Sequence, residues 1–163
     1  VIRPGDSELE TLAAPPNPRD FDALGYLPRA TALARQRMSD AVLVDFDVQP
    51  VGPDGRVDLT KPDGEVDYRF RSPGRSATGE KEPRCLVNVE VKATEVEVVS
   101  VRSFRGCKEP ARPAWRCTLA GAARLAQSQG VPRRPAKVSW LQDGWFFSLD
   151  DPDVAETVKD RCR

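Results

Sequence analysis

The chain combines two unusual features, the absence of histidine and the presence of four cysteines in 163 residues, and together they limit its fold and its chemistry. Histidine is the most common general acid or base and the most common metal ligand in proteins. Its absence argues against most hydrolytic triads, Cys-His nucleophiles and histidine-bound zinc. The cysteines stand far apart and form no CxxC pair, which is typical of structural disulfides. They are Cys85, Cys107, Cys117 and Cys162.

Four cysteines allow three pairings. Cys107 and Cys117 lie in a Pro- and Arg-rich stretch with few apolar neighbours, and Cys162 lies in a polar segment, so buried free thiols have no evident role there. If residues 96–102 return as the hairpin partner of 85–92, Cys85 comes within loop reach of Cys107. We therefore favour the pairs Cys85–Cys107 and Cys117–Cys162 and an oxidising, extracytoplasmic compartment that is periplasmic, cell-surface or secreted. Reduced, buried cysteines in an intracellular protein are the alternative.

The length suits one domain, and no apolar run approaches the ~20 residues of a membrane span. Residues 1–19 are rich in proline and are interpreted as a flexible linker or tether, with a short helical turn over Ser7–Ala13, ahead of a single domain over 20–163. A sequence that starts at Val1 leaves room for a membrane anchor upstream. Arginine outnumbers lysine by 19 to 6, which we interpret as the codon bias of a GC-rich, bacterial genome.

Residue spacing predicts helices in three places. Apolar residues recur at intervals of three and four over 28–38, as on one face of a helix. A second helix is predicted over 119–129, with Thr118 as its N-cap and Gly130 just after its end. A third, short helix is expected after Asp151.

Alternation of apolar and polar residues predicts strands. In the first strand Val42, Val44, Phe46 and Val48 are expected to share one buried face. Pro-Asp-Gly turns precede the second and third strands. The pair Asp143-Gly144, typical of a type I′ turn, is expected to join the last two strands, whose register puts Trp140 and Trp145 on one face. The predicted strands are 41–49, 56–60, 65–71, 85–92, 96–102, 136–141 and 145–149.

This order of elements predicts an α+β fold in which helices pack on a curved antiparallel β-sheet. The sheet consists of a meander and a C-terminal hairpin, stabilised by disulfides, and no strand–helix alternation supports a parallel sheet. The layout of residues 20–149, a helix leading into an antiparallel meander, resembles cystatin-like and PepSY-like domains. The resemblance implies a module for binding, inhibition or sensing.

Two surfaces are candidates for partner binding. The stretch from Arg102 to Lys137 holds nine basic residues and a single acid, Glu109, within a chain whose net charge is zero. If folding gathers its arginines, they form a surface for an anionic partner; otherwise they are separately solvated or paired with acids of 143–160. The candidates are Arg102, Arg105, Arg112, Arg116, Arg133 and Arg134. Leu141 and Phe146 are the candidate apolar partner surface, unless a loop covers them.

Motifs for catalysis or cofactor binding are absent from the sequence. No phosphate-binding glycine loop, EF-hand or nucleophile elbow occurs, and the cysteine spacing lacks zinc knuckles, so we expect no catalytic residue, metal or cofactor. No basic stretch is interleaved with aromatics, which argues against nucleic acid. Asp45 and Asp47, which share one strand face, are the carboxylates on which an enzyme would depend, but a solvated sheet face is the interpretation that we favour for them.

The leading hypothesis is therefore a non-enzymatic extracytoplasmic module that binds or senses a protein or an anionic envelope component. The first alternative is a carboxylate-based enzyme. The second is an intracellular docking scaffold with an arginine-rich face and reduced cysteines.

Overall fold

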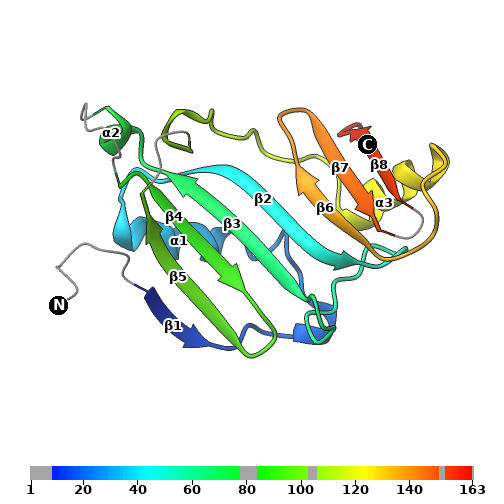
Figure 1. Ribbon diagram of the computed structural model, residues 1–163, viewed down its shortest axis with the longest axis horizontal. Coiled ribbons are helices and arrows are strands. Elements are labelled where there is room, and N and C mark those ends of the chain that lie inside the picture. Colours follow the sequence, from blue (N-terminus) through cyan, green and yellow to red (C-terminus); the bar gives the residue numbers. More distant parts are fainter. Residues whose placement is uncertain (1–8, 78–83, 103–105, 151–152, 163) are drawn as a thin grey trace.

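A single open antiparallel sheet of eight strands forms the body of the protein, with β1 and β8 at its edges (Figure 1). The structure, a computed structural model, describes residues 9–77, 84–102, 106–150 and 153–162. The strand order is β1-β5-β4-β3-β2-β6-β7-β8. These strands and the helices confirm the predicted α+β class. The strands are β1 (Leu9–Ala13), β2 (Val42–Val51), β3 (Glu65–Arg71), β4 (Leu86–Val91), β5 (Glu95–Val101), β6 (Ala136–Trp140), β7 (Gly144–Leu149) and β8 (Val154–Lys159).

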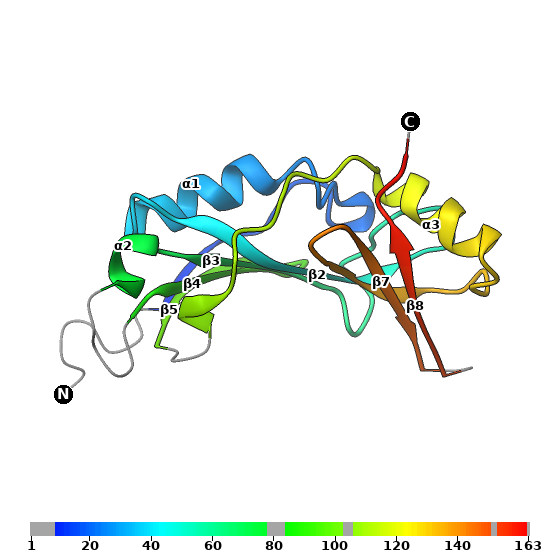
Figure 2. The same ribbon diagram turned by 90° about the horizontal axis from the view of Figure 1, so that it is seen from above.

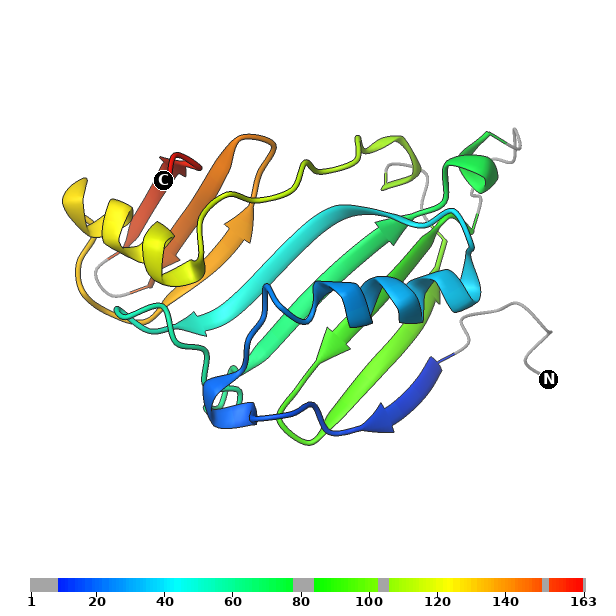
Figure 3. The same ribbon diagram turned by 180° about the vertical axis from the view of Figure 1, so that it is seen from behind.

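The two longer helices, α1 (Leu27–Arg37) and α3 (Leu119–Ser128), lie on the same face of the sheet (Figures 2 and 3). Both confirm the prediction to within one residue. The hydroxyl of Thr118 accepts the N–H of Gly121 at 3.0 Å and so caps α3. Gly130 follows α3 at a φ of 96°, the left-handed conformation that glycine adopts without strain. The shorter elements are α2 (Pro73–Ser76) and the 3-10 turns η1 (Pro18–Asp20) and η2 (Gly106–Lys108).

The main core fills the space between the sheet and these two helices. Alternate residues of each strand point into it, so the helix-facing side chains of the central strands are fully buried. Tyr68, the most polar of them, donates its hydroxyl to the carbonyl of Ala23 at 2.5 Å. The described part of the chain contains no helix with the length and apolarity needed to cross a membrane.

A small second core lies on the other face of the sheet, called here the outer face. A bulge between Leu43 and Asp45 changes the side to which β2 residues point. The prediction that Val42, Val44, Phe46 and Val48 share one face is therefore wrong. Phe46 and Val48 belong to the main core, whereas Val42 and Val44 pack in the outer core. The other members of the outer core are Cys85, Leu86, Val101 and Cys107.

Two disulfides hold a segment that passes from one face of the sheet to the other. They are Cys85–Cys107 and Cys117–Cys162, with Cα atoms 5.7 and 4.9 Å apart, which confirms the favoured pairing. Cys107 lies in the outer core and Cys117 in the main core, so we call residues 107–117 the crossing segment. At its middle, Arg112 donates its backbone N–H to the carbonyl of Leu43 at 2.7 Å. The segment thus runs past the part of β2 that β6 leaves unpaired.

Both ends of the described chain differ from the prediction. Leu9–Ala13, placed in the linker, instead forms β1 and pairs antiparallel with β5 from Leu9↔Val99 to Ala13↔Glu95. The backbone of β5 needs a hydrogen-bonding partner on that edge, and a proline-rich composition does not reveal this. The helix expected after Asp151 is also wrong over its described part, because 154–159 forms β8 and pairs with β7. Its start, residues 151–152, lies outside the described residues.

Two local predictions also need correction. Residues 56–60 form no strand beyond a single bridge, Val51↔Val57, because Asp58 accepts the N–H and hydroxyl of Thr60 and closes a turn. In the last hairpin, Trp140 pairs with Trp145 and the N–H of Leu141 bonds the carbonyl of Gly144. The loop is therefore 142–143, one residue earlier than predicted.

Candidate functional site

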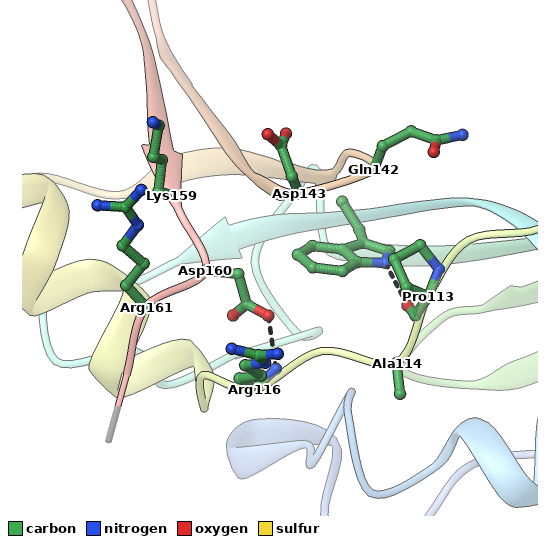
Figure 4. Close-up of a pocket in the computed structure, with 9 residues that line it drawn as sticks. Pro113, Ala114, Arg116, Gln142, Asp143, Lys159, Asp160 and Arg161 are labelled. Atoms are coloured by element: carbon green, nitrogen blue, oxygen red, sulfur yellow. Dashed lines mark hydrogen bonds between the residues drawn. The ribbon is translucent and has the colours of Figure 1, made fainter.

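Three distant stretches of chain meet at a pocket of about 350 Å³ near the end of β8 (Figure 4). The crossing segment forms one wall, the β6–β7 turn forms the second, and the end of β8 with the two residues that follow it forms the third. We call this hollow the Asp160 pocket. It is lined by Pro113, Ala114, Arg116, Trp140, Gln142, Asp143, Lys159, Asp160 and Arg161.

Asp160 ties the three walls together. Its Oδ2 accepts the backbone N–H of Arg116 at 2.6 Å, and its Oδ1 accepts the N–H of Cys117 at 2.8 Å and the indole N–H of Trp145 at 3.1 Å. Its own N–H bonds the carbonyl of Asp143 at 3.1 Å. The residue is only 9% exposed. With both oxygens accepting N–H donors from separate parts of the chain, this carboxylate serves as a structural anchor.

The walls are also fixed by aromatic packing and by a covalent bond. The indole N–H of Trp140 bonds the carbonyl of Pro113 at 3.0 Å, and the ring centroids of Trp140 and Trp145 lie 4.6 Å apart. Trp115 packs edge-on against Trp140. The Cys117–Cys162 disulfide lies next to Arg116 and Arg161 in sequence. The pocket is therefore formed before any ligand enters it.

Three cations surround this pocket. Arg116, Lys159 and Arg161 are all exposed. Figure 4 shows Lys159 and Arg161 on one side of Asp160, with Asp143 and Gln142 on the other. Within the described residues, none of the three side chains has an ion-pair partner. Exposed arginine and lysine side chains in this position can contact an anion such as a carboxylate or phosphate.

A wider hollow of about 580 Å³ near η1 is a weaker candidate for a binding site. Its Arg56 is already paired with Asp20 at 3.0 Å. Burial of this exposed pair under a ligand would remove an existing interaction, so we do not treat it as the candidate site.

The structure spreads the predicted arginines over several regions. Arg116 lines the Asp160 pocket, whereas the side chain of Arg112 bonds the carbonyl of Val44 at 2.9 Å. Arg102 follows β5, and the exposed Arg133 and Arg134 precede β6. Three strands separate β5 from β6 in the sheet, so Arg102 lies apart from the other two. Arg105 lies outside the described residues.

The remaining predicted residues lie at the turn of the last hairpin and on the outer face. Leu141 and Phe146 are both half-buried, and Phe146 lies between Ser139 and Thr157 in the sheet register. Asp45 and Asp47 are half-buried on the outer face and line none of the described hollows. Ser139 donates its hydroxyl to Asp47.

Asp47 belongs to a line of four acids that crosses the outer face, which is turned toward the viewer in Figure 1. The register pairs Asp47 with Asp67, Asp67 with Glu90, and Glu90 with Glu97. We call Asp47, Asp67, Glu90 and Glu97 the carboxylate row. Burial, followed by the charges of Glu65 and Glu90, raises the pKa of Asp67 to about 7. Burial and Glu65 also raise the pKa of Glu90.

Sequence reasoning missed Lys159, Asp160 and Arg161, because they fall in a segment expected to begin as a helix. One indication was available. The favoured Cys117–Cys162 pair already required that the residues before Cys162 lie beside Arg116. No family model matches the chain, and the comparisons with curated proteins and with solved structures found no match either.

Proposed function

We propose that the chain is a non-enzymatic extracytoplasmic binding module that holds an anionic group of a protein or envelope component in the Asp160 pocket. The observation that carries the proposal is the set of three cations, Arg116, Lys159 and Arg161, around a pocket whose walls are already fixed. Arginine side chains form two parallel hydrogen bonds with carboxylates and phosphates, and a rigid pocket lowers the entropy cost of binding.

The extracytoplasmic assignment is supported by the two disulfides. All four cysteines are paired, and disulfides persist in oxidising compartments. Each bond holds one end of the crossing segment, and that segment supplies one wall of the pocket. The proposed binding site thus depends on oxidised cysteines, whereas the intracellular scaffold considered above requires reduced ones.

A binding role is favoured over catalysis by how the pocket uses its carboxylates. Asp160 accepts three N–H donors, so both of its oxygens are already used to hold the pocket walls together. The chain offers no imidazole as a substitute. For the carboxylate-based alternative, Asp45 and Asp47 lie on a sheet face outside the described hollows.

The experiment is a titration followed by tryptophan fluorescence, because Trp140 lines the pocket. Inorganic phosphate and glucuronate are added separately at constant ionic strength to the unmodified chain, to an Arg116→Gln/Arg161→Gln variant and to an Arg124→Gln control. Arg124 is exposed on α3 and lies outside the pocket. Loss of two charge-assisted hydrogen bonds is expected to weaken binding about tenfold or more. A fluorescence change that does not saturate with added ligand would reject the proposal. So would an equal loss of affinity in the Arg124 control.

A further inference from the structure

We infer that the carboxylate row shares a proton at neutral pH, so that the sheet is more stable in mildly acidic than in mildly alkaline solution. The row crosses four adjacent strands, β2, β3, β4 and β5, on the face that α1 and α3 leave uncovered (Figures 1 and 3). The inference concerns the stability of the sheet and does not depend on the Asp160 pocket.

The register places these acids in direct opposition. Residues opposite each other on antiparallel strands have Cβ atoms about 5 Å apart, and like charges there are destabilising. Asp67 is opposite an acid on both of its neighbouring strands, Asp47 on β2 and Glu90 on β4. Carboxylate oxygens of Glu65, Asp67 and Glu90 lie within 4.8 Å of one another. Charged carboxylates at these distances repel one another strongly, and a shared proton removes this repulsion.

Asp67 also has an oxygen that no donor satisfies. Its Oδ1 is buried and has no hydrogen-bond partner among the described residues. A buried carboxylate oxygen without a donor is costly when charged, whereas a protonated carboxyl can donate a hydrogen bond to a neighbouring acid. This observation is independent of the register and also favours a proton at the centre of the row.

The charged groups around Asp67 do not compensate it. Asp47 faces Asp67 from β2, Glu65 acts on it from β3 and Glu90 faces it from β4. The next charged groups out from these are Arg69, Lys92 and Glu97 around Glu90, and Asp45 beside Asp47, with Glu109 of the crossing segment near Asp45. The two cations are engaged elsewhere. Arg69 is opposite Asp45 and donates to Asn88 at 3.2 Å, and Lys92 pairs with Glu97 at 3.8 Å. Among the described residues, Asp67 and Glu90 have no ion-pair partner.

The pKa shifts have the sign that this arrangement requires. The pKa of Asp67 rises to about 7 in the folded chain, against about 3.9 for an ordinary aspartate. Burial also raises the pKa values of Glu90 and Asp45. The folded state therefore binds protons more tightly than the unfolded state. The stabilisation is complete below the unfolded pKa of about 3.9 and is lost as pH rises through about 7.

The test compares the unmodified chain with Asp67→Asn and with Asp63→Asn as control. Asp63 is an exposed acid in the turn before β3. Urea midpoints are measured from pH 8.5 to 5.5. The unmodified chain and the Asp63 variant are expected to gain stability as pH falls. Asp67→Asn, which is neutral at every pH, is expected to be more stable than the unmodified chain at pH 8.5 and to lose most of this pH dependence.

A direct titration of the unmodified chain keeps the test decisive if a variant folds poorly. Carbon-13 NMR of the side-chain carboxyls is expected to show Asp67 titrating close to neutral pH. Titration of Asp67 below pH 5 would overturn the inference. A second outcome would also overturn it: millimolar Ca²⁺ raises the urea midpoint at pH 8.5 in the unmodified chain but not in Asp67→Asn. In that case a metal ion, and not a proton, would neutralise the row.

Discussion

Trp145 and Asp160 are joined by a hydrogen bond of 3.1 Å between the indole N–H and the carboxylate, inside the main core. The bond connects β7 to the residue that directly follows β8. The same carboxylate accepts two backbone N–H groups of the crossing segment, so the contact also connects the sheet to the wall of the candidate site.

Replacement of Asp160 by alanine is expected to be strongly destabilising. It leaves three N–H donors without an acceptor at a site that is only 9% exposed. Each buried donor without a partner costs about 1–3 kcal/mol, so a loss of at least 3 kcal/mol is expected. Urea denaturation measures it. Asp160→Asn, which keeps one acceptor oxygen, should lose less, and equal losses would show that the hydrogen bonds contribute little.

A second prediction contrasts two glycines. At Gly144 in β7, an added Cβ would lie 2.5 Å from the carbonyl oxygen of Val158 on β8, and neither backbone can move without breaking the pairing. At Gly130 nothing lies within 4 Å, and the cost is that of a positive φ. Gly130→Ala is expected to lower the free energy of unfolding by about 1–2 kcal/mol, and Gly144→Ala is expected to lower it by more. Thermal unfolding measures both. The reverse order would contradict the tight approach of β7 and β8.

Local chemistry explains which parts of the fold were predictable. The helix over 119–128 follows from a cap at Thr118 and a glycine at its end, both of which act within one turn. The Cys85–Cys107 pair follows from the geometry of one hairpin. In each case the determining contacts lie close together in the sequence.

The two errors at the ends of the described chain have a different cause, because they depend on partners that are distant in the sequence. Val154 and Val158 stand four residues apart, which suits a helix, but Val158 is buried opposite Trp145 in the sheet. Leu9–Ala13 becomes a strand because β5 offers a free edge. The carboxylate row escaped notice because Asp67 and Glu90 meet only through the register of β3 and β4.

The disulfides give a third prediction. Alkylation and mass spectrometry of the unreduced protein should find no free thiol, and four after reduction. Removal of either pair by serine substitution should cost about 2–5 kcal/mol, because the unfolded chain regains the freedom that the cross-link removed. The Cys117–Cys162 bond spans 45 residues against 22, which adds about 0.6 kcal/mol to its loss. Four free thiols in the native protein would contradict the extracytoplasmic assignment.

The last prediction concerns Trp140, which belongs both to the main core and to the pocket. Its side chain is 1% exposed, it packs on Trp115 and Trp145, and its N–H bonds the carbonyl of Pro113. Trp140→Ala is expected to cost about 3–5 kcal/mol, since it leaves a cavity and an unpaired carbonyl. Trp140→Phe retains most of the packing but no N–H donor. It should therefore cost less in urea denaturation while it loosens Pro113, which backbone amide exchange of the crossing segment would detect. Equal losses for both variants would show that the hydrogen bond, and not the packing, holds the crossing segment in place.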